Sequence, residues 1–131
     1  MAKLIHTMIR VHDLDASLKF YRDVFDMTES HRFDFPDFSL VYLRNTEDDA
    51  EIELTWNKGR ETPYTHGDGY GHVAFVTPDV AKRHAELVAD GFQPLPLKEF
   101  KDGETLLARF FFILDPDGYK IEVLETLGHF R

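Results

Sequence analysis

The chain repeats one order of predicted elements twice, and this internal repeat limits the folds that it can adopt. In the first half an alternating strand carries His6, and Asp13, seven residues later, precedes a segment with apolar residues at helical spacing. In the second half His72 precedes Asp79 by the same seven residues, and another helical segment follows. Self-similarity of this kind indicates two copies of one supersecondary unit.

Each half reads as a strand, a helix and three further strands. The helices are predicted from Asp13 to about residue 25 and from Asp79 to about residue 90, where Gly91 ends the second one. The predicted strands cover residues 4–11, 28–33, 39–43, 51–57, 71–76, 92–95, 108–114 and 120–124. Residues 58–69 are expected to be a linker, so module 1 spans about 1–57 and module 2 about 70–131 of a single domain. The expected fold class is α+β, with two tandem βαβββ modules forming a curved mixed sheet.

The last predicted strand follows a turn with the sequence Asp-Pro-Asp-Gly at residues 115–118. The proline presets φ for the turn, and the glycine supplies a positive φ without steric cost. In the strand that follows, Glu122 stands on the face opposite Ile121 and Val123. A carboxylate at this place is costly to bury unless a positive or hydrogen-bonding group meets it.

Each module places one histidine on its first strand and one glutamate on its last strand. His6 and Glu53 are separated by 47 residues, and His72 and Glu122 by 50. All four side chains are predicted opposite an apolar face, so we expect them to line one cavity. Two imidazoles and two carboxylates suit a divalent metal ion and leave room for water or substrate. Taken singly, each of these residues could instead be a structural histidine or a solvated glutamate.

Composition narrows the classes of function. The net charge of −9 disfavours nucleic acid and anionic membranes as partners. The absence of cysteine excludes disulfides and cysteine-ligated metal sites, and it suits the expected cytoplasmic location. We expect no signal peptide and no membrane span. Nucleophilic catalysis has little support, because neither a nucleophile elbow nor a phosphate-binding glycine loop occurs.

The remaining histidines and the phenylalanine-rich stretches are interpreted as structural. The histidines expected to be structural or solvent-facing are His12, His31, His66, His84 and His129. Core packing is also the favoured role for Phe33, Phe35 and Phe38, with the lining of a pocket as the alternative.

Four segments of the chain resemble the glyoxalase I (lactoylglutathione lyase) family of the vicinal-oxygen-chelate superfamily. In the family's order and at similar spacing they are HTMIRV at 6–11, IELTWN at 52–57, YGHVA at 70–74 and DPDGYKIE at 115–122. The resemblance implies that one divalent metal ion per site is bound by His6, Glu53, His72 and Glu122. A histidine as first ligand in a short chain favours Ni²⁺ or Co²⁺, with Zn²⁺ as the alternative.

The resemblance also implies a homodimer whose active sites lie at the interface, with the first His–Glu pair from one chain and the second pair from the other. Arg10 and Asn57 are expected to contact the γ-glutamyl end of glutathione. Family members often carry basic residues for the glycyl carboxylate in the loop before the second histidine, but residues 65–69 contain no Arg or Lys. Lys101 is therefore assigned to that carboxylate. Whether Lys98 or His66 contacts the substrate, and which thiol is used, stay open.

The implied reaction isomerises the hemithioacetal of methylglyoxal and glutathione to S-lactoylglutathione, the activity of a carbon–sulfur lyase that detoxifies methylglyoxal. A bound metal would stabilise the enediolate. Glu122 is assigned as the base, and Glu53 as a second catalytic carboxylate on the opposite face of the substrate. The alternatives are a metal-dependent epimerase, a ring-cleaving dioxygenase and a non-catalytic small-molecule-binding member of the superfamily. Glu53 argues against the first two, since the epimerase typically has Gln at this position and the dioxygenase has no ligand there.

Overall fold

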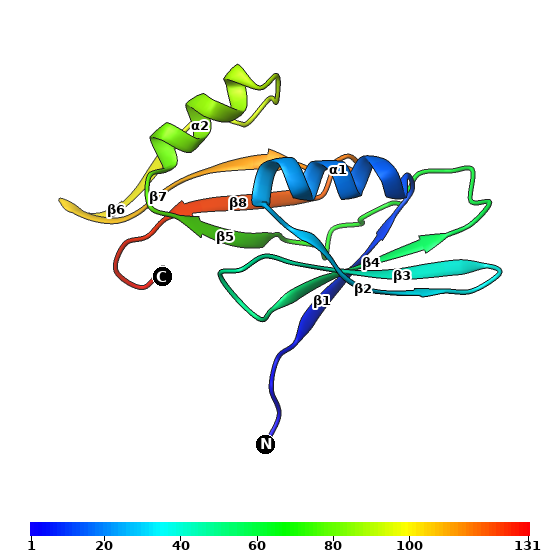
Figure 1. Ribbon diagram of the computed structural model, residues 1–131. Coiled ribbons are helices and arrows are strands. Elements are labelled where there is room, and N and C mark those ends of the chain that lie inside the picture. Colours follow the sequence, from blue (N-terminus) through cyan, green and yellow to red (C-terminus); the bar gives the residue numbers. More distant parts are fainter. The chain divides into compact units, whose positions relative to one another are not determined.

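The computed structural model describes residues 1–131, which divide into two compact units, Met1–Thr65 and His66–Arg131. Each unit contains one helix and one four-stranded sheet (Figure 1). In both units the order along the chain is strand, helix and three strands, and both sheets are mixed. The predicted pair of tandem βαβββ modules is therefore confirmed.

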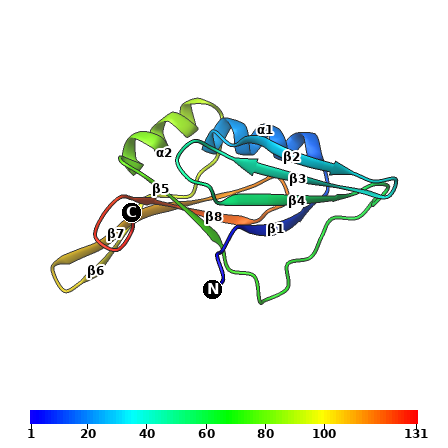
Figure 2. The same cartoon turned by 60° about the horizontal axis from the view of Figure 1, so that its bottom comes forward.

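The elements of the first unit lie close to their predicted positions. They are β1 (His6–Val11), α1 (Leu14–Phe25), β2 (Thr28–Asp34), β3 (Phe38–Arg44) and β4 (Glu51–Asn57). The strand order is β1-β4-β3-β2, with β4 parallel to β1 and antiparallel to β3. Figure 2 shows these four strands side by side. Because β4 is an inner strand, residues on both of its faces are buried, Glu53 among them.

Short-range hydrogen bonds mark both ends of helix α1. The Asp13 carboxylate accepts the Ala16 N–H at 3.1 Å, as an N-cap does. At the other end Asp26 takes the left-handed conformation with φ of 54°, and its N–H reaches the carbonyl of Arg22. The helix contacts β2 and buries Phe20, Tyr21, Val24 and Phe25. The core of the unit also takes apolar side chains from one face of the sheet: Ile9, Val11, Val41, Leu43, Ile52 and Leu54.

The second unit repeats this plan. Its elements are β5 (Val73–Thr77), α2 (Val80–Ala89), β6 (Lys98–Asp102), β7 (Thr105–Leu114) and β8 (Lys120–Glu125), in the sheet order β5-β8-β7-β6. Asp79 caps α2 by accepting the Lys82 N–H at 3.0 Å. The helix contacts β7 and β8, where His84 meets the edge of the fully buried Phe111.

One predicted strand is wrong, because residues 92–95 form no strand. The prolines within and directly after this segment lack an N–H group, so the segment cannot sustain a ladder of hydrogen bonds. Instead, Phe92 donates its N–H to the carbonyl of Leu87 at the end of α2, and Leu95 makes a single backbone bond to Phe112.

The edge strand of the second sheet is β6, a charged segment that sequence periodicity did not single out. It is exposed along its whole length and pairs with β7 through a hairpin in which Gly103 has a φ of 60°. Strand β7 accordingly begins at Thr105, three residues earlier than predicted. Strand β5 begins at Val73, so His72 lies directly before the strand and not within it.

The predicted turn before β8 is confirmed. Gly118 has a φ of 83°, and its N–H bonds the carbonyl of Asp115 at 2.9 Å. The side chain of Asp115 is buried and accepts the N–H groups of Asp117 and Tyr119, both at 2.9 Å. The turn thereby sets where β8 starts, and with it the position of Glu122.

Candidate functional site

The first unit brings together its predicted histidine and glutamate. His6 opens the edge strand β1, and Glu53 lies in the middle of the neighbouring strand β4, where its register partner on β1 is Met8. His6 and Met8 share a face of the sheet, and Glu53 points to the same side. The His6 Nε2 and Glu53 Oε2 atoms are 3.4 Å apart, with the side chains 33% and 12% exposed.

The second unit builds the same pair from equivalent positions. His72 directly precedes β5, and Ala74, two residues later, is the register partner of Glu122 on β8. The His72 Nε2 and Glu122 Oε1 atoms are 3.6 Å apart, with the side chains 43% and 16% exposed. In each unit, therefore, one imidazole nitrogen and one carboxylate oxygen converge on the outer, partly solvated side of the sheet.

The geometry of the pairs fits metal ligation. Two ligand atoms about 2.1 Å from one ion, at the angles of tetrahedral or octahedral coordination, lie roughly 3.0–3.4 Å apart. The two N–O separations of 3.4 and 3.6 Å are close to this range and long for a direct hydrogen bond. Neither unit by itself gathers three or more His, Asp or Glu side chains in a position to hold a metal ion. Each unit thus offers two candidate ligands, one histidine and one glutamate.

A tyrosine that was not predicted from the sequence contacts both residues of the first His–Glu pair. Tyr42 on β3 is the register partner of Glu53, and its hydroxyl donates a hydrogen bond to Glu53 Oε1 at 2.5 Å. Its ring lies edge-on to His6, with ring centres 5.7 Å apart. The bond to the carboxylate, helped by burial and by the negative charge, raises the pKa of Tyr42 to about 12. No spacing rule could find Tyr42, since only the cross-strand register places it beside Glu53.

More aromatic side chains continue from Tyr42 across the same face. His31 and Phe33 on β2 have ring centres 4.5 Å apart, and Phe33 lies edge-on to Tyr42 at 6.2 Å. Phe33 is 46% exposed and Phe35 43%, so the predicted core role of these two residues is wrong. The first pair is therefore flanked by an accessible aromatic surface.

Two of the residues expected to bind substrate, Arg10 and Asn57, lie on the same strands as the first His–Glu pair. Arg10 follows His6 by four positions on β1, and Asn57 follows Glu53 by four on β4, so both share a sheet face with the first pair. The Asn57 amide donates to the Tyr64 hydroxyl at 2.8 Å, which orients its side chain.

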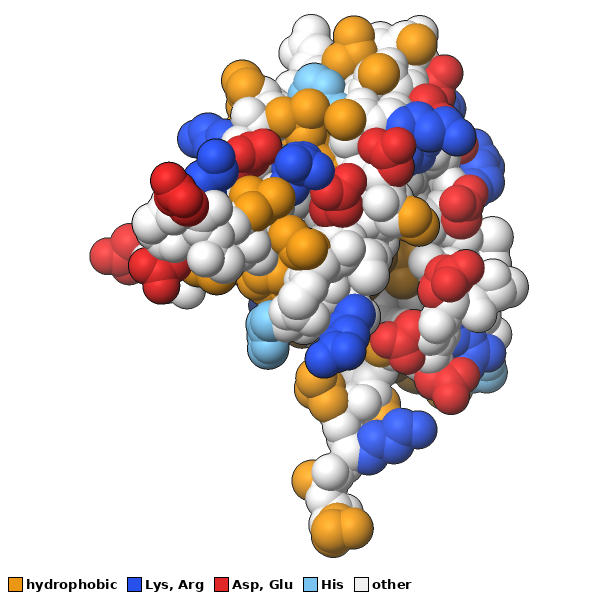
Figure 3. All heavy atoms as spheres, turned by 90° about the vertical axis from the view of Figure 1, so that its left-hand side faces the viewer, with side chains coloured by type: hydrophobic (Ala, Val, Ile, Leu, Met, Phe, Trp, Pro, Cys, Tyr) orange, Lys and Arg blue, Asp and Glu red, His pale blue; other side chains and the backbone are white.

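Lys101 has a different setting. It lies on the exposed strand β6, 3.4 Å from the Glu99 carboxylate, and its register partner is Leu106. Phe112, which pairs with Glu122, is six residues further along β7, or about 20 Å at about 3.3 Å per residue. Lys98 pairs with Phe110 and is much closer. Strand β6 has the sequence KEFKD, so it offers no uniformly basic surface. Figure 3 shows acidic and basic side chains intermingled on the face in view.

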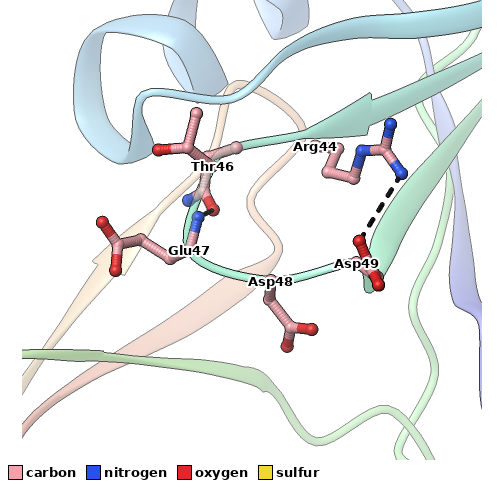
Figure 4. A pocket seen from close by; sticks show the side chains of 6 residues that line it. Arg44, Thr46, Glu47, Asp48 and Asp49 are labelled. Carbon is pink, nitrogen blue, oxygen red and sulfur yellow. Dashed lines mark hydrogen bonds and ion pairs between the residues drawn. The ribbon is translucent and has the colours of Figure 1, made fainter.

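His66 stacks on Tyr119, with ring centres 4.1 Å apart, and its buried Nε2 atom has no hydrogen-bond partner. Two hollows on the surface are lined by residues other than the predicted metal ligands. The larger one, about 540 Å³, is formed by residues 44–49 after β3. Figure 4 shows Arg44 and Asp49 facing each other there, with a 3.9 Å ion pair. The smaller, about 380 Å³, is lined by Ala81, Leu97, Lys98, Glu99 and Arg109.

Tandem βαβββ modules, each with one helix and a mixed four-stranded sheet, are the fold of the vicinal-oxygen-chelate class of proteins. Residues 3–123 match the family model for the Glyoxalase/Bleomycin resistance protein/Dioxygenase superfamily, and the chain belongs to this superfamily.

Relatives with known names cover nearly the whole chain. Lactoylglutathione lyase of Haemophilus influenzae is 41% identical over 129 residues, covering 95% of this chain and 93% of that protein. A probable lactoylglutathione lyase of Synechocystis is 39% identical, with coverage of 94% and 95%. Among solved structures, the trypanothione-dependent glyoxalase I of Leishmania major is 34% identical with a TM-score of 0.75, covering 95% of this chain and 87% of that one. No helix of the chain is long and apolar enough to cross a membrane.

Proposed function

We propose that the protein is a lactoylglutathione lyase, a glyoxalase I that isomerises the hemithioacetal of methylglyoxal and glutathione to S-lactoylglutathione. The observation that carries the proposal is the matched His–Glu pair in each module, at 3.4 and 3.6 Å. The names of the relatives at 36–41% identity, which match over nearly their full length, support the same activity.

We further propose that one divalent metal ion is held by His6, Glu53, His72 and Glu122, with Ni²⁺ or Co²⁺ favoured over Zn²⁺. The two neutral imidazoles and two carboxylates would balance the charge of such an ion, and the four donors leave positions for substrate oxygens. When bound, the metal supplies Lewis-acid stabilisation to the two adjacent oxygens of the substrate.

In this proposal Glu122 moves the proton. Its carboxylate takes the proton from the carbon that carries sulfur, so that this C–H bond breaks and the electron pair forms the enediolate. The protonated carboxyl then returns the proton to the adjacent carbon. The hydroxyl proton of the first carbon passes to the oxygen of the second, so that a thioester carbonyl remains at the first carbon and a hydroxyl group at the second. Glu122 suits this role because its side chain is only 16% exposed and lies on one sheet face with Phe112 and the buried Leu124.

The remaining residues position the substrate. Arg10 and Asn57 share a face with the first His–Glu pair and are proposed to bind the γ-glutamyl end of glutathione, and Lys101 or Lys98 the glycyl carboxylate. We propose a homodimer in which the first pair of one chain meets the second pair of the other, since each unit offers only two ligands. The cytoplasmic location stays a prediction from the sequence.

The test is reconstitution of the metal-free protein with Ni²⁺, Co²⁺ or Zn²⁺, followed by thioester formation from methylglyoxal and glutathione. Glu122→Gln is expected to keep the metal and to lose turnover by several orders of magnitude, whereas the exposed Glu104→Gln is expected to behave as wild type. His6→Ala is expected to lower the metal content, with His12→Ala as its control. Wild-type turnover by Glu122→Gln, or unchanged metal content in His6→Ala, contradicts the assigned roles.

Light scattering tests the dimer, which should be the form that carries metal and activity. A fully active monomer contradicts the proposal that the ligands come from two chains. A parallel assay with trypanothione in place of glutathione tests the thiol, because the Leishmania relative is described as trypanothione-dependent.

A further inference from the structure

The two His–Glu pairs differ in the aromatic residue that faces each carboxylate across the strand ladder. In the first unit Tyr42 is the register partner of Glu53, and its ring lies against His6 at 5.7 Å and 70°. In the second unit Phe112 is the register partner of Glu122, and its ring lies against His72 at 5.4 Å and 78°. The aromatic rings therefore occupy equivalent places, and only the ring in the first unit carries a hydrogen-bond donor.

The hydroxyl group changes what the carboxylate beside it can do. Tyr42 donates to Oε1 of Glu53, while Oε2 is the oxygen that lies 3.4 Å from His6 Nε2. One oxygen is thus engaged inside the unit, and the other is left for a ligand. A hydrogen bond to a charged carboxylate is about twice as strong as one between neutral groups. Since Tyr42 and Glu53 are also joined by the backbone ladder of β3 and β4, the carboxylate is held in one orientation.

Glu122 has no such restraint, because phenylalanine cannot donate a hydrogen bond. Its Oε1 lies 3.6 Å from His72 Nε2, and the facing ring can only pack against it. A carboxylate that must take a proton from one carbon and return it to the next has to reorient, whereas one that only holds a cation does not.

We propose that Tyr42 is a positioning residue whose hydroxyl group fixes Glu53 as a rigid one-oxygen ligand, and that the lack of this group at Phe112 leaves Glu122 as the carboxylate that moves the proton. This inference rests on the proposed function. It replaces the expectation from the sequence that Glu53 is a second catalytic carboxylate, and it assigns different tasks to two glutamates that the internal repeat would otherwise make equivalent.

The first test is Tyr42→Phe, which removes one oxygen and installs the residue that the second unit already uses. Hydrogen bonds that orient metal ligands typically contribute about 10–100-fold to metal affinity. We expect Ni²⁺ and Co²⁺ titrated calorimetrically into the metal-free variant to bind about 10–100-fold more weakly than to wild type. Tyr70→Phe is the matched control, since its hydroxyl bonds only the Lys120 carbonyl at 3.2 Å. Wild-type affinity in Tyr42→Phe overturns the proposal.

A double-mutant cycle separates positioning from a general structural effect. If Tyr42 acts through Glu53, then Tyr42→Phe should change Co²⁺ affinity little in a Glu53→Ala background. An equal loss in both backgrounds shows that the tyrosine acts elsewhere and overturns the proposal. The visible spectrum of bound Co²⁺ should change in Tyr42→Phe but not in Tyr70→Phe.

The reciprocal variant Phe112→Tyr places a hydroxyl group beside Glu122. We expect kcat to fall at least tenfold while KM stays within about threefold of wild type and metal affinity does not fall, because the base is now restrained. An unchanged kcat contradicts the role given to the missing hydroxyl group. Metal binding that responds to Tyr42→Phe in a protein without lyase activity would refute the proposed function alone, and full lyase activity with no response would refute this inference alone.

Discussion

The hydrogen bond between Tyr42 and Glu53 should make the stability of the metal-free protein depend on alkaline pH. The pKa of Tyr42 is raised from 10.0 to about 12 by the bond to Glu53, burial and the neighbouring negative charge. Because the folded state holds the phenol proton more tightly than the unfolded chain, the stabilisation is complete below pH about 10 and is lost as the pH rises to about 12. A difference of about two pKa units corresponds to at most roughly 2–3 kcal/mol. Because water screens a side chain that is only partly buried, the expected contribution to stability is about 1 kcal/mol.

The assay compares wild type with Tyr42→Phe, so that the titration of lysines and of the other tyrosines cancels. Free energies of unfolding from urea denaturation should differ most near neutral pH, and the difference should shrink by about 1 kcal/mol above pH about 10. Phenolate absorbance provides a second measurement. Burial raises the pKa of Tyr70 as well, so the titration of Tyr42 is the late phenolate signal that is present in wild type and absent from Tyr42→Phe. In Glu53→Gln that tyrosine should titrate nearer to its ordinary value, because the negative charge is gone.

A difference in stability that stays constant across this pH range would refute the reasoning. So would a tyrosine titration that Glu53→Gln leaves unchanged, since the pKa shift would then have another origin.

Three further predictions concern the scaffold. Asp115→Ala should lower the free energy of unfolding by about 2–4 kcal/mol in urea, because the buried carboxylate accepts two N–H groups that would lose their partner. Phe111→Ala should cost about 3–5 kcal/mol in the same measurement, since the fully buried ring would leave a cavity under α2; a loss below about 1 kcal/mol would contradict the packing described. Asp79→Ala should lower stability by about 1 kcal/mol through loss of the N-cap, and Asp79→Asn should restore most of it.

Local structure was predictable wherever it depends on neighbouring residues. Asp13 and Asp79 cap helices because a short acidic side chain reaches the N–H three residues ahead, which needs no tertiary contact. The turn at residues 115–118 follows from the proline and glycine that its backbone angles require. The internal repeat also predicted that each histidine lies beside a glutamate, because two similar modules must place equivalent residues alike.

Strand β6 shows where this reasoning fails. Its sequence, KEFKD, is exposed on both faces and has no apolar alternation to reveal a strand. It is a strand because β7 offers it an open edge and Gly103 closes the hairpin. The apolar segment 92–95 looked like the better candidate, but the prolines beside its hydrophobic residues prevent pairing.

The sequence by itself determined the tandem modules, the helix ends, the turn before β8 and the candidate ligands, since each depends on spacing or on contacts along the chain. Tertiary structure alone decided which side chains meet across strands. Tyr42 and Glu53 are eleven residues apart, and only the register between β3 and β4 brings the hydroxyl group to the carboxylate. A one-residue shift of that register would turn the hydroxyl group to the other face of the sheet, because successive side chains of a strand alternate between the two faces. The pairing of the strands therefore sets the distance between the hydroxyl group and the carboxylate, and the order of residues along the chain does not.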